Sequence, residues 1–214
     1  MFAYCNNEPV ASTDPTGHYI GHRPIMVCDN GSPRAALMET LMLMRKKYTG
    51  LANCYAFSIK LPTDPQTGEP FQKRPQPGDF SDGYASPDLD GFMEKVYNEC
   101  DADLEGLSKN IINAVIEDGQ VLGFTITKAD SANACAKGGA WVIALGFGYD
   151  LSTGHRDYHW WRRMECGFWF HKNGGDSVSP FDDLGRYITD PQKCNRGLYS
   201  YFLGYFLIEP TQNK

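Results

Sequence analysis

The spacing of apolar and polar positions divides this chain into a helical first half and a strand-rich second half. Apolar side chains first recur at helical spacing at Leu37, Leu41 and Met44, which would share one face of a helix. A serine followed by a proline is typical of a helix start, because serine caps the free N–H groups and proline fits the first turn. We therefore predict helices that begin at residues 32–33, near Asn53 and at residues 86–87, and a fourth over residues 103–117.

The pattern changes after Gly119 to β-branched and aromatic runs separated by turn residues. These runs predict strands over residues 121–127, 139–147, 157–163, 167–171 and 199–208. The run over residues 140–147 is apolar at almost every position and should form a buried strand. Helices that come first and an antiparallel sheet that follows indicate an α+β fold, with N-terminal helices packed on a C-terminal antiparallel β-sheet.

The composition is ordinary for a globular domain. The chain has 214 residues, of which 42% are hydrophobic and 21% charged, so it can bury a sizeable core in one domain. Its net charge of −6 argues against a nucleic-acid partner, since phosphate binding needs clustered Lys and Arg. No apolar run approaches the roughly 20 residues that span a bilayer. Prolines and glycines over residues 62–87 predict a long ordered loop or lid.

Cysteine usage points to a reducing compartment. The seven cysteines are an odd number and include no Cys-x-x-Cys pair, so we expect no disulfide framework. The N-terminus lacks the basic and apolar segments of a signal peptide, which predicts synthesis in the cytoplasm without one. One Cys and two His could supply three zinc ligands, but a zinc-type local spacing is absent, and we expect no metal and no cofactor.

Cys54 is the strongest candidate for chemistry because it falls at the start of a predicted helix. Backbone N–H groups at a helix start stabilise a thiolate, which predicts a lowered thiol pKa. The same groups can donate to the oxyanion that forms when a thiolate attacks an acyl carbon. Asn53 and Tyr55 flank the thiol and are the candidates to support this site. The Asn53 oxygen is expected to cap the helix; the alternative is that its amide lines the oxyanion site. A buried structural thiol is the alternative for Cys54.

A thiol nucleophile needs a base, and two histidines far downstream could meet Cys54 in space. His159 is the expected base; the alternative is that His159 is a structural histidine of the core. Strand alternation places it on one face with Asp157 and Trp161. His171, on the other arm of a predicted hairpin, is expected to bind His159 and fix its tautomer. The alternatives for this third position are Asp157, Asp182, Asp183 and Asn195.

Residues 2–18 resemble the closing element of an Rhs/YD-repeat core. The stretch reads Asn-Asn-x-Pro-Val and then Asp-Pro-Thr-Gly at the family's spacing, with Glu8 where the family more often has Asn or Asp. The resemblance implies that residues 1–19 end the repeat core or form a linker. It also implies that residues 20–214 form a single variable toxin domain. A coincidental pair of turns is the alternative.

Residues 53–208 resemble an uncharacterised group of papain-like, NlpC-type toxin domains. The matching blocks lie at residues 53–59, 157–163, 169–174 and 199–206. This resemblance implies a papain-like fold in which Cys54, His159 and a third polar residue form a catalytic triad. The sequence departs from the family at residues 166–168, where more polar residues are usual.

Together the two resemblances imply an effector toxin that hydrolyses an amide or peptide bond, or that acts as a deamidase or transamidase. They imply a protein or peptidoglycan substrate, a cognate immunity protein, and delivery to a target cell by a specialised secretion system. Two other classes are kept as alternatives. One is a non-catalytic binding module that uses the aromatic sheet face, and the other is a toxin of different chemistry, such as ADP-ribosyl transfer with Glu165 as its candidate residue.

Overall fold

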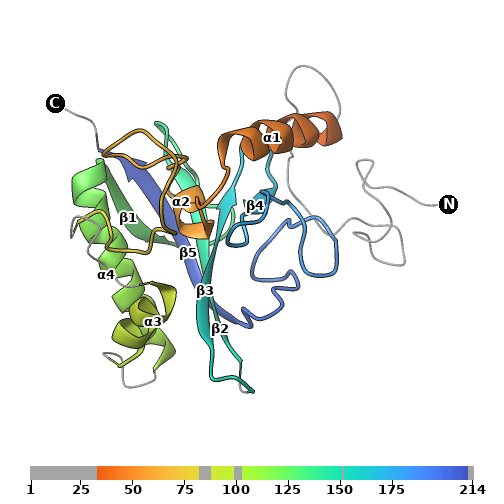
Figure 1. Cartoon of the computed structure of the whole chain (residues 1–214). Coiled ribbons are helices and arrows are strands. Elements are labelled where there is room, and N and C mark those ends of the chain that lie inside the picture. Colours follow the sequence, from red (N-terminus) through yellow and green to blue (C-terminus); the bar gives the residue numbers. More distant parts are fainter. Residues whose placement is uncertain (1–32, 82–87, 99–102, 151, 212–214) are drawn as a thin grey trace.

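A computed structural model of the chain describes residues 33–81, 88–98, 103–150 and 152–211 (Figure 1). Within these ranges the helices are α1 (Pro33–Lys47), α2 (Cys54–Ser58), α3 (Leu89–Asn98) and α4 (Leu104–Leu122). The strands are β1 (Phe124–Ala129), β2 (Trp141–Tyr149), β3 (Arg156–Arg163), β4 (Trp169–His171) and β5 (Tyr201–Pro210). The predicted α+β order is confirmed. The leader at residues 1–19 and the helix starts at residues 32 and 86–87 lie outside the described residues.

The five strands form one antiparallel sheet in the order β1-β5-β2-β3-β4. Helices α3 and α4 lie on one side of this sheet, and the irregular segment over residues 172–200 lies on the other (Figure 1). Strand β4 is short and pairs with β3 only at Trp161, Arg162 and Arg163. The first half of β3, which carries His159, therefore extends beyond the end of β4, close to α2.

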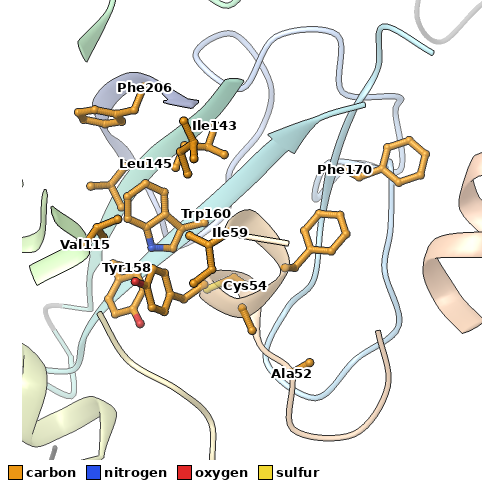
Figure 2. Close-up of a cluster of buried hydrophobic side chains, with 14 of the residues drawn as sticks. Ala52, Cys54, Ile59, Val115, Ile143, Leu145, Tyr158, Trp160, Phe170 and Phe206 are labelled. Atoms are coloured by element: carbon orange, nitrogen blue, oxygen red, sulfur yellow. The ribbon is translucent and has the colours of Figure 1, made fainter. Parts of the chain in front are cut away.

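Both faces of the sheet are buried, and β3 contributes to each. Tyr158 and Trp160 belong to the main core between the sheet and the helices, which Figure 2 shows together with Ile59 at the end of α2. Trp161 belongs to a second, smaller core on the opposite face, with Trp169. The predicted alternation along β3 is confirmed, and the strand over residues 140–147 is buried as expected.

Helix α2 is a single buried turn whose ends are fixed by side chains. Its first turn is capped by Asn53, whose side-chain oxygen accepts a hydrogen bond from the Ala56 N–H at 3.1 Å. At the other end, the Arg162 guanidinium donates to the carbonyl of Phe57 at 2.6 Å. A turn this short is marginal by itself, so these bonds and the burial of the whole helix hold Cys54 in place.

Helix α4 ends later than predicted, and β1 begins later. The helix runs to Leu122 instead of residue 117 because Gly123 adopts a left-handed conformation (φ 78°) and closes the last turn. The strand predicted from Val121 is therefore wrong over its first residues, and β1 starts at Phe124. The other four strands begin and end within two residues of the predicted bounds.

The described part of the proline-rich segment, residues 62–81, contains neither helix nor strand. The last turn of this segment is held by Asp118, a buried carboxylate on α4. Asp118 accepts hydrogen bonds from the backbone N–H groups of Gly78 at 2.7 Å, Phe80 at 2.8 Å and Ser81 at 3.0 Å. It also accepts one from the Tyr55 hydroxyl at 2.5 Å. The segment is thereby tied both to α4 and to the residue that follows Cys54.

Candidate thiol site

A cleft of about 690 Å³ lies where the start of α2 meets the free half of β3. Cys54 and His159 both line it, as do Asp157 and Tyr199. Its remaining walls come from the proline-rich segment, from the start of α3 and from the loop after β4; the lining residues there are Lys73, Arg74, Gln76, Asp88, Leu89, Asp90, Asn173, Gly174, Gly175 and Asp176. The structure thus brings together two candidate residues that are far apart in the sequence.

The Cys54 thiol is buried, with 7% of the residue exposed, and lies against β3. Backbone N–H groups of Trp160, Tyr55 and Cys54 itself are near enough to lower the pKa of the thiol. Trp160 is the residue after His159, so the thiol and the base candidate are held by the same short stretch of strand. Within the described residues no hydrogen bond joins the sulfur to the His159 ring, an arrangement that is common before a substrate binds.

The thiol is protonated at neutral pH. Burial raises the pKa of Cys54 to about 12, and the nearby Asp157 carboxylate adds to this effect. The three backbone N–H groups lower the pKa, but they do not outweigh the burial. The expectation of a lowered thiol pKa is therefore wrong for this resting state, because α2 is a single turn and its start is buried.

The two histidines form a directed hydrogen-bond chain. His171 Nε2 lies 2.8 Å from the carbonyl oxygen of Phe181, and His171 Nδ1 lies 2.8 Å from His159 Nε2. A carbonyl can only accept, so the proton of a neutral His171 is on Nε2 and its Nδ1 is an acceptor. The proton of His159 must then be on its Nε2. This leaves His159 Nδ1 with a free lone pair.

Aromatic rings hold the His159 side chain in this orientation. The Tyr199 ring stacks on it with centroids 4.6 Å apart, and the Trp161 ring meets it edge-on at 4.7 Å. Gly146 of β2 lies opposite His159, and a Cβ at that position would come within 2.9 Å of the Trp161 ring. Burial in these surroundings lowers the pKa of His159 well below its usual value. The ring is therefore neutral at pH 7, as a general base must be.

The other candidates for the third position bind elsewhere. Asp157 accepts from the Tyr199 hydroxyl at 2.8 Å, and Asp182 pairs with Arg186 at 2.9 Å. Asp183 is exposed, and Asn195 uses its side-chain oxygen for the backbone of its own turn. In the part of the chain described here, His171 is the candidate that is hydrogen-bonded to the His159 ring.

Both residues that flank Cys54 are engaged by their side chains. The Asn53 oxygen caps α2 and its amide donates to the carbonyl of Pro75 at 2.7 Å, so of the two roles considered for it, the structure shows the helix cap. The Tyr55 hydroxyl binds Asp118 in the core. Tyr55 consequently faces the sulfur with its backbone N–H and not with its side chain.

Two residues of the site were not identified from the sequence. Gln76 is buried in the cleft wall, where its side-chain oxygen accepts from the Tyr158 hydroxyl at 2.6 Å. Tyr199 lies within one of the family-like blocks, but nothing in the pattern showed that its ring would stack on His159. Both residues take their places through contacts between segments that are distant in the chain.

The described residues hold neither a metal-binding group of side chains nor a membrane-spanning helix. They contain no group of three or more His, Cys, Asp or Glu side chains arranged to hold a metal ion. Among the same residues, no helix combines the length and the apolar character needed to cross a membrane.

Iodoacetamide should alkylate the exposed Cys135 before Cys54 at neutral pH. The reagent reacts with thiolates, and because the pKa of Cys54 is raised to about 12, its rate should rise about tenfold per pH unit through the mildly alkaline range. Peptide mapping by mass spectrometry, over a series of pH values, gives the rate at each thiol. A rate at Cys54 that levels off near neutral pH would contradict the raised pKa.

Comparison with known proteins gave one partial relative. A 54-residue stretch of the chain is 41% identical to a protein described as insoluble matrix shell protein 1 from Ruditapes philippinarum. The match spans 25% of this chain and 36% of the relative, so the relative is covered over only about a third of its length. No family model matches the chain. No solved structure matches it either.

Proposed function

We propose that the chain is a papain-like thiol hydrolase in which Cys54 is the nucleophile, His159 the base and His171 the residue that orients the base. The observation that carries this proposal is the chain of hydrogen bonds from the Phe181 carbonyl through His171 to His159. It leaves one nitrogen of His159 unprotonated at a cleft that Cys54 also lines. A base with one nitrogen fixed and the other free is what a nucleophilic thiol requires.

In the acylation step, His159 Nδ1 takes the thiol proton while the Cys54 sulfur attacks the carbonyl carbon of an amide. A C–S bond forms and the carbonyl oxygen becomes an oxyanion, which the backbone N–H groups at the start of α2 would stabilise. Because the thiol and the imidazole are both neutral at rest, the proton moves during the attack and not before it. Collapse of the oxyanion breaks the C–N bond, and His159 returns the proton to the departing amine.

In the deacylation step, the free His159 Nδ1 removes a proton from water, and the resulting hydroxide attacks the thioester. The C–S bond breaks, the carboxylic acid leaves, and the thiol regains its proton from the imidazolium. An amine in place of water gives transamidation, and a glutamine side chain as the substrate gives deamidation. His171 accepts a hydrogen bond from the His159 ring in both steps. This bond stabilises the imidazolium that forms during acylation and again during deacylation.

The order of nucleophile, base and orienting residue along the chain also supports the papain-like assignment. The nucleophile is at the start of a helix, the base on the facing strand β3, and its partner on the adjacent strand β4. With the Rhs-like leader, we propose an effector toxin that is made in the cytoplasm and delivered to a target cell. Its substrate would be a protein or peptidoglycan, and an immunity protein would neutralise it in the producing cell.

A second candidate is a non-catalytic binding module. The description of the partial relative as an insoluble shell matrix protein favours it, since a matrix component need not be an enzyme. In that case binding would use a surface other than the aromatic sheet faces, which are buried in the two cores, and changes at Cys54 would leave the function intact.

A small activated ester distinguishes the two. We expect p-nitrophenyl acetate to acetylate Cys54, giving a burst of p-nitrophenolate followed by slow turnover. Peptide mapping after a brief reaction should locate the acetyl group on Cys54. The buried thiol Cys166 is an internal control, and the variant Cys135→Ser removes reaction at the exposed thiol. A burst that is unchanged in Cys54→Ala would exclude the thiol mechanism.

A further inference from the structure

Lys172 is a buried cation that the proposed mechanism does not use. It directly follows His171 at the end of β4, and only 1% of the residue is exposed. Its ammonium donates to two neutral acceptors, the carbonyl of Gly174 at 2.9 Å and the carbonyl of Gly50 at 3.3 Å. Within the described residues, no carboxylate lies within ion-pair distance of its nitrogen. Burying an ammonium without an anionic partner is costly, so its presence calls for an explanation.

The two acceptors belong to the two parts of the molecule that frame the thiol. Gly50 is in the turn between α1 and α2, four residues before Cys54. Gly174 is in the loop that follows β4 and forms one wall of the cleft. Both have a positive φ, of 58° and 49°, so each lies in a tight turn of the backbone. Lys172 therefore links the turn that precedes Cys54 to the end of the strand that carries His171.

Three groups among the described residues act on the charge of the Lys172 ammonium. Asp176 of the cleft wall attracts it, and Arg74 of the proline-rich segment repels it. The third group is Cys54, which attracts it once the thiol has lost its proton. Burial lowers the pKa of Lys172, as expected for an ammonium held by carbonyls alone. The Asp157 carboxylate has the reverse effect and disfavours a thiolate.

We propose that Lys172 is a positioning residue of the thiol site, which clamps the turn before Cys54 to the cleft wall and stabilises negative charge on the sulfur. This inference rests on the proposed function for its purpose, but it concerns the thiol itself. The positive charge of the ammonium offsets the unfavourable effect of Asp157 on the thiolate as the proton leaves. A neutral side chain of the same length would keep the packing and lose this balance.

The test is the pH dependence of Cys54 alkylation by iodoacetamide, in the full chain, for wild type, Lys172→Met and Lys172→Arg. Below the thiol pKa, we expect Lys172→Met to react about tenfold more slowly than wild type at the same pH, and Lys172→Arg to recover most of the rate. An unchanged Cys54 profile in a folded Lys172→Met variant would overturn the proposal. Equal slowing in both variants would also overturn it, because the charge would then be irrelevant.

Circular dichroism and thermal unfolding establish that each variant is folded. If Lys172→Met does not fold, Lys172→Gln, which keeps an N–H donor for the two carbonyls but has no charge, carries the same comparison. Alkylation requires no acyl transfer. If the p-nitrophenolate burst is missing but the Lys172 variants change the alkylation rate as expected, only the proposed function is contradicted. If the burst is present but the Lys172 variants leave the alkylation rate unchanged, only the role of Lys172 is contradicted.

Discussion

Replacing His159 with alanine should slow acetylation of Cys54 by p-nitrophenyl acetate about 10²- to 10⁴-fold. The size of the effect follows from the resting state, in which burial raises the pKa of the thiol to about 12. Without a base, only the very small thiolate fraction at neutral pH would attack. The measurement is the rate of the p-nitrophenolate burst, with the acetyl group located by peptide mapping.

Changes at His171 should give a graded loss in the same assay. His171→Ala removes the acceptor for His159 Nε2–H. The His159 tautomer is then no longer fixed and its imidazolium is less stabilised, so we expect the acetylation rate to fall about tenfold to hundredfold. His171→Asn retains an oxygen acceptor and should lose less. A burst rate that is unaffected by His159→Ala would contradict the assignment of the base.

Replacing Asp118 with alanine should lower the free energy of unfolding by about 3 to 5 kcal/mol. The change leaves four donors without their acceptor: the buried Tyr55 hydroxyl and Phe80 N–H, and the half-buried N–H groups of Gly78 and Ser81. Burial raises the pKa of Asp118 to about 6, so the carboxylate is still charged at pH 7. Its loss should release both the proline-rich segment and the residue next to Cys54.

Urea unfolding monitored by tryptophan fluorescence gives the change in stability. The matched control is Glu117→Ala, which removes an exposed carboxylate one position earlier on α4 and should change the free energy of unfolding by less than about 0.5 kcal/mol. Equal stability of the Asp118→Ala and Glu117→Ala variants would contradict the role assigned to the buried carboxylate.

The features that the sequence predicted correctly rest on local rules. Apolar spacing placed the helices and strands because each element must bury one face. The helix start at Cys54 followed from the capping preference of Asn53, and the cap is found. The contact between His159 and His171 was foreseen because two arms of an antiparallel hairpin face each other, and their rings lie within hydrogen-bonding distance.

The features that the sequence did not predict depend on contacts between distant segments. The pKa of Cys54 was expected to fall, and it rises because the surrounding core and Asp157 determine it, not the helix start alone. The anchor at Asp118 joins residues that are 63 and 40 positions away in the chain. The stacking of Tyr199 on His159 requires the segment over residues 172–200 to fold back across the sheet. Such pairings have no signature in periodicity or composition.

Growth of a bacterial culture that expresses the full 214-residue chain tests the central proposal most directly. The chain would be expressed in the cytoplasm and, with an added secretion signal, in the periplasm. Arrest confined to the periplasm would favour a cell-wall substrate, and arrest in the cytoplasm a protein substrate. Cys166→Ala, which also removes a buried thiol, is the matched control for Cys54→Ala.

If the chain is a thiol-hydrolase toxin, we expect the wild type and Cys166→Ala to arrest growth at equal expression, and Cys54→Ala to allow normal growth. Normal growth with the wild type in both compartments would contradict the toxin assignment. Arrest by Cys54→Ala as strong as that by the wild type would contradict the thiol mechanism itself.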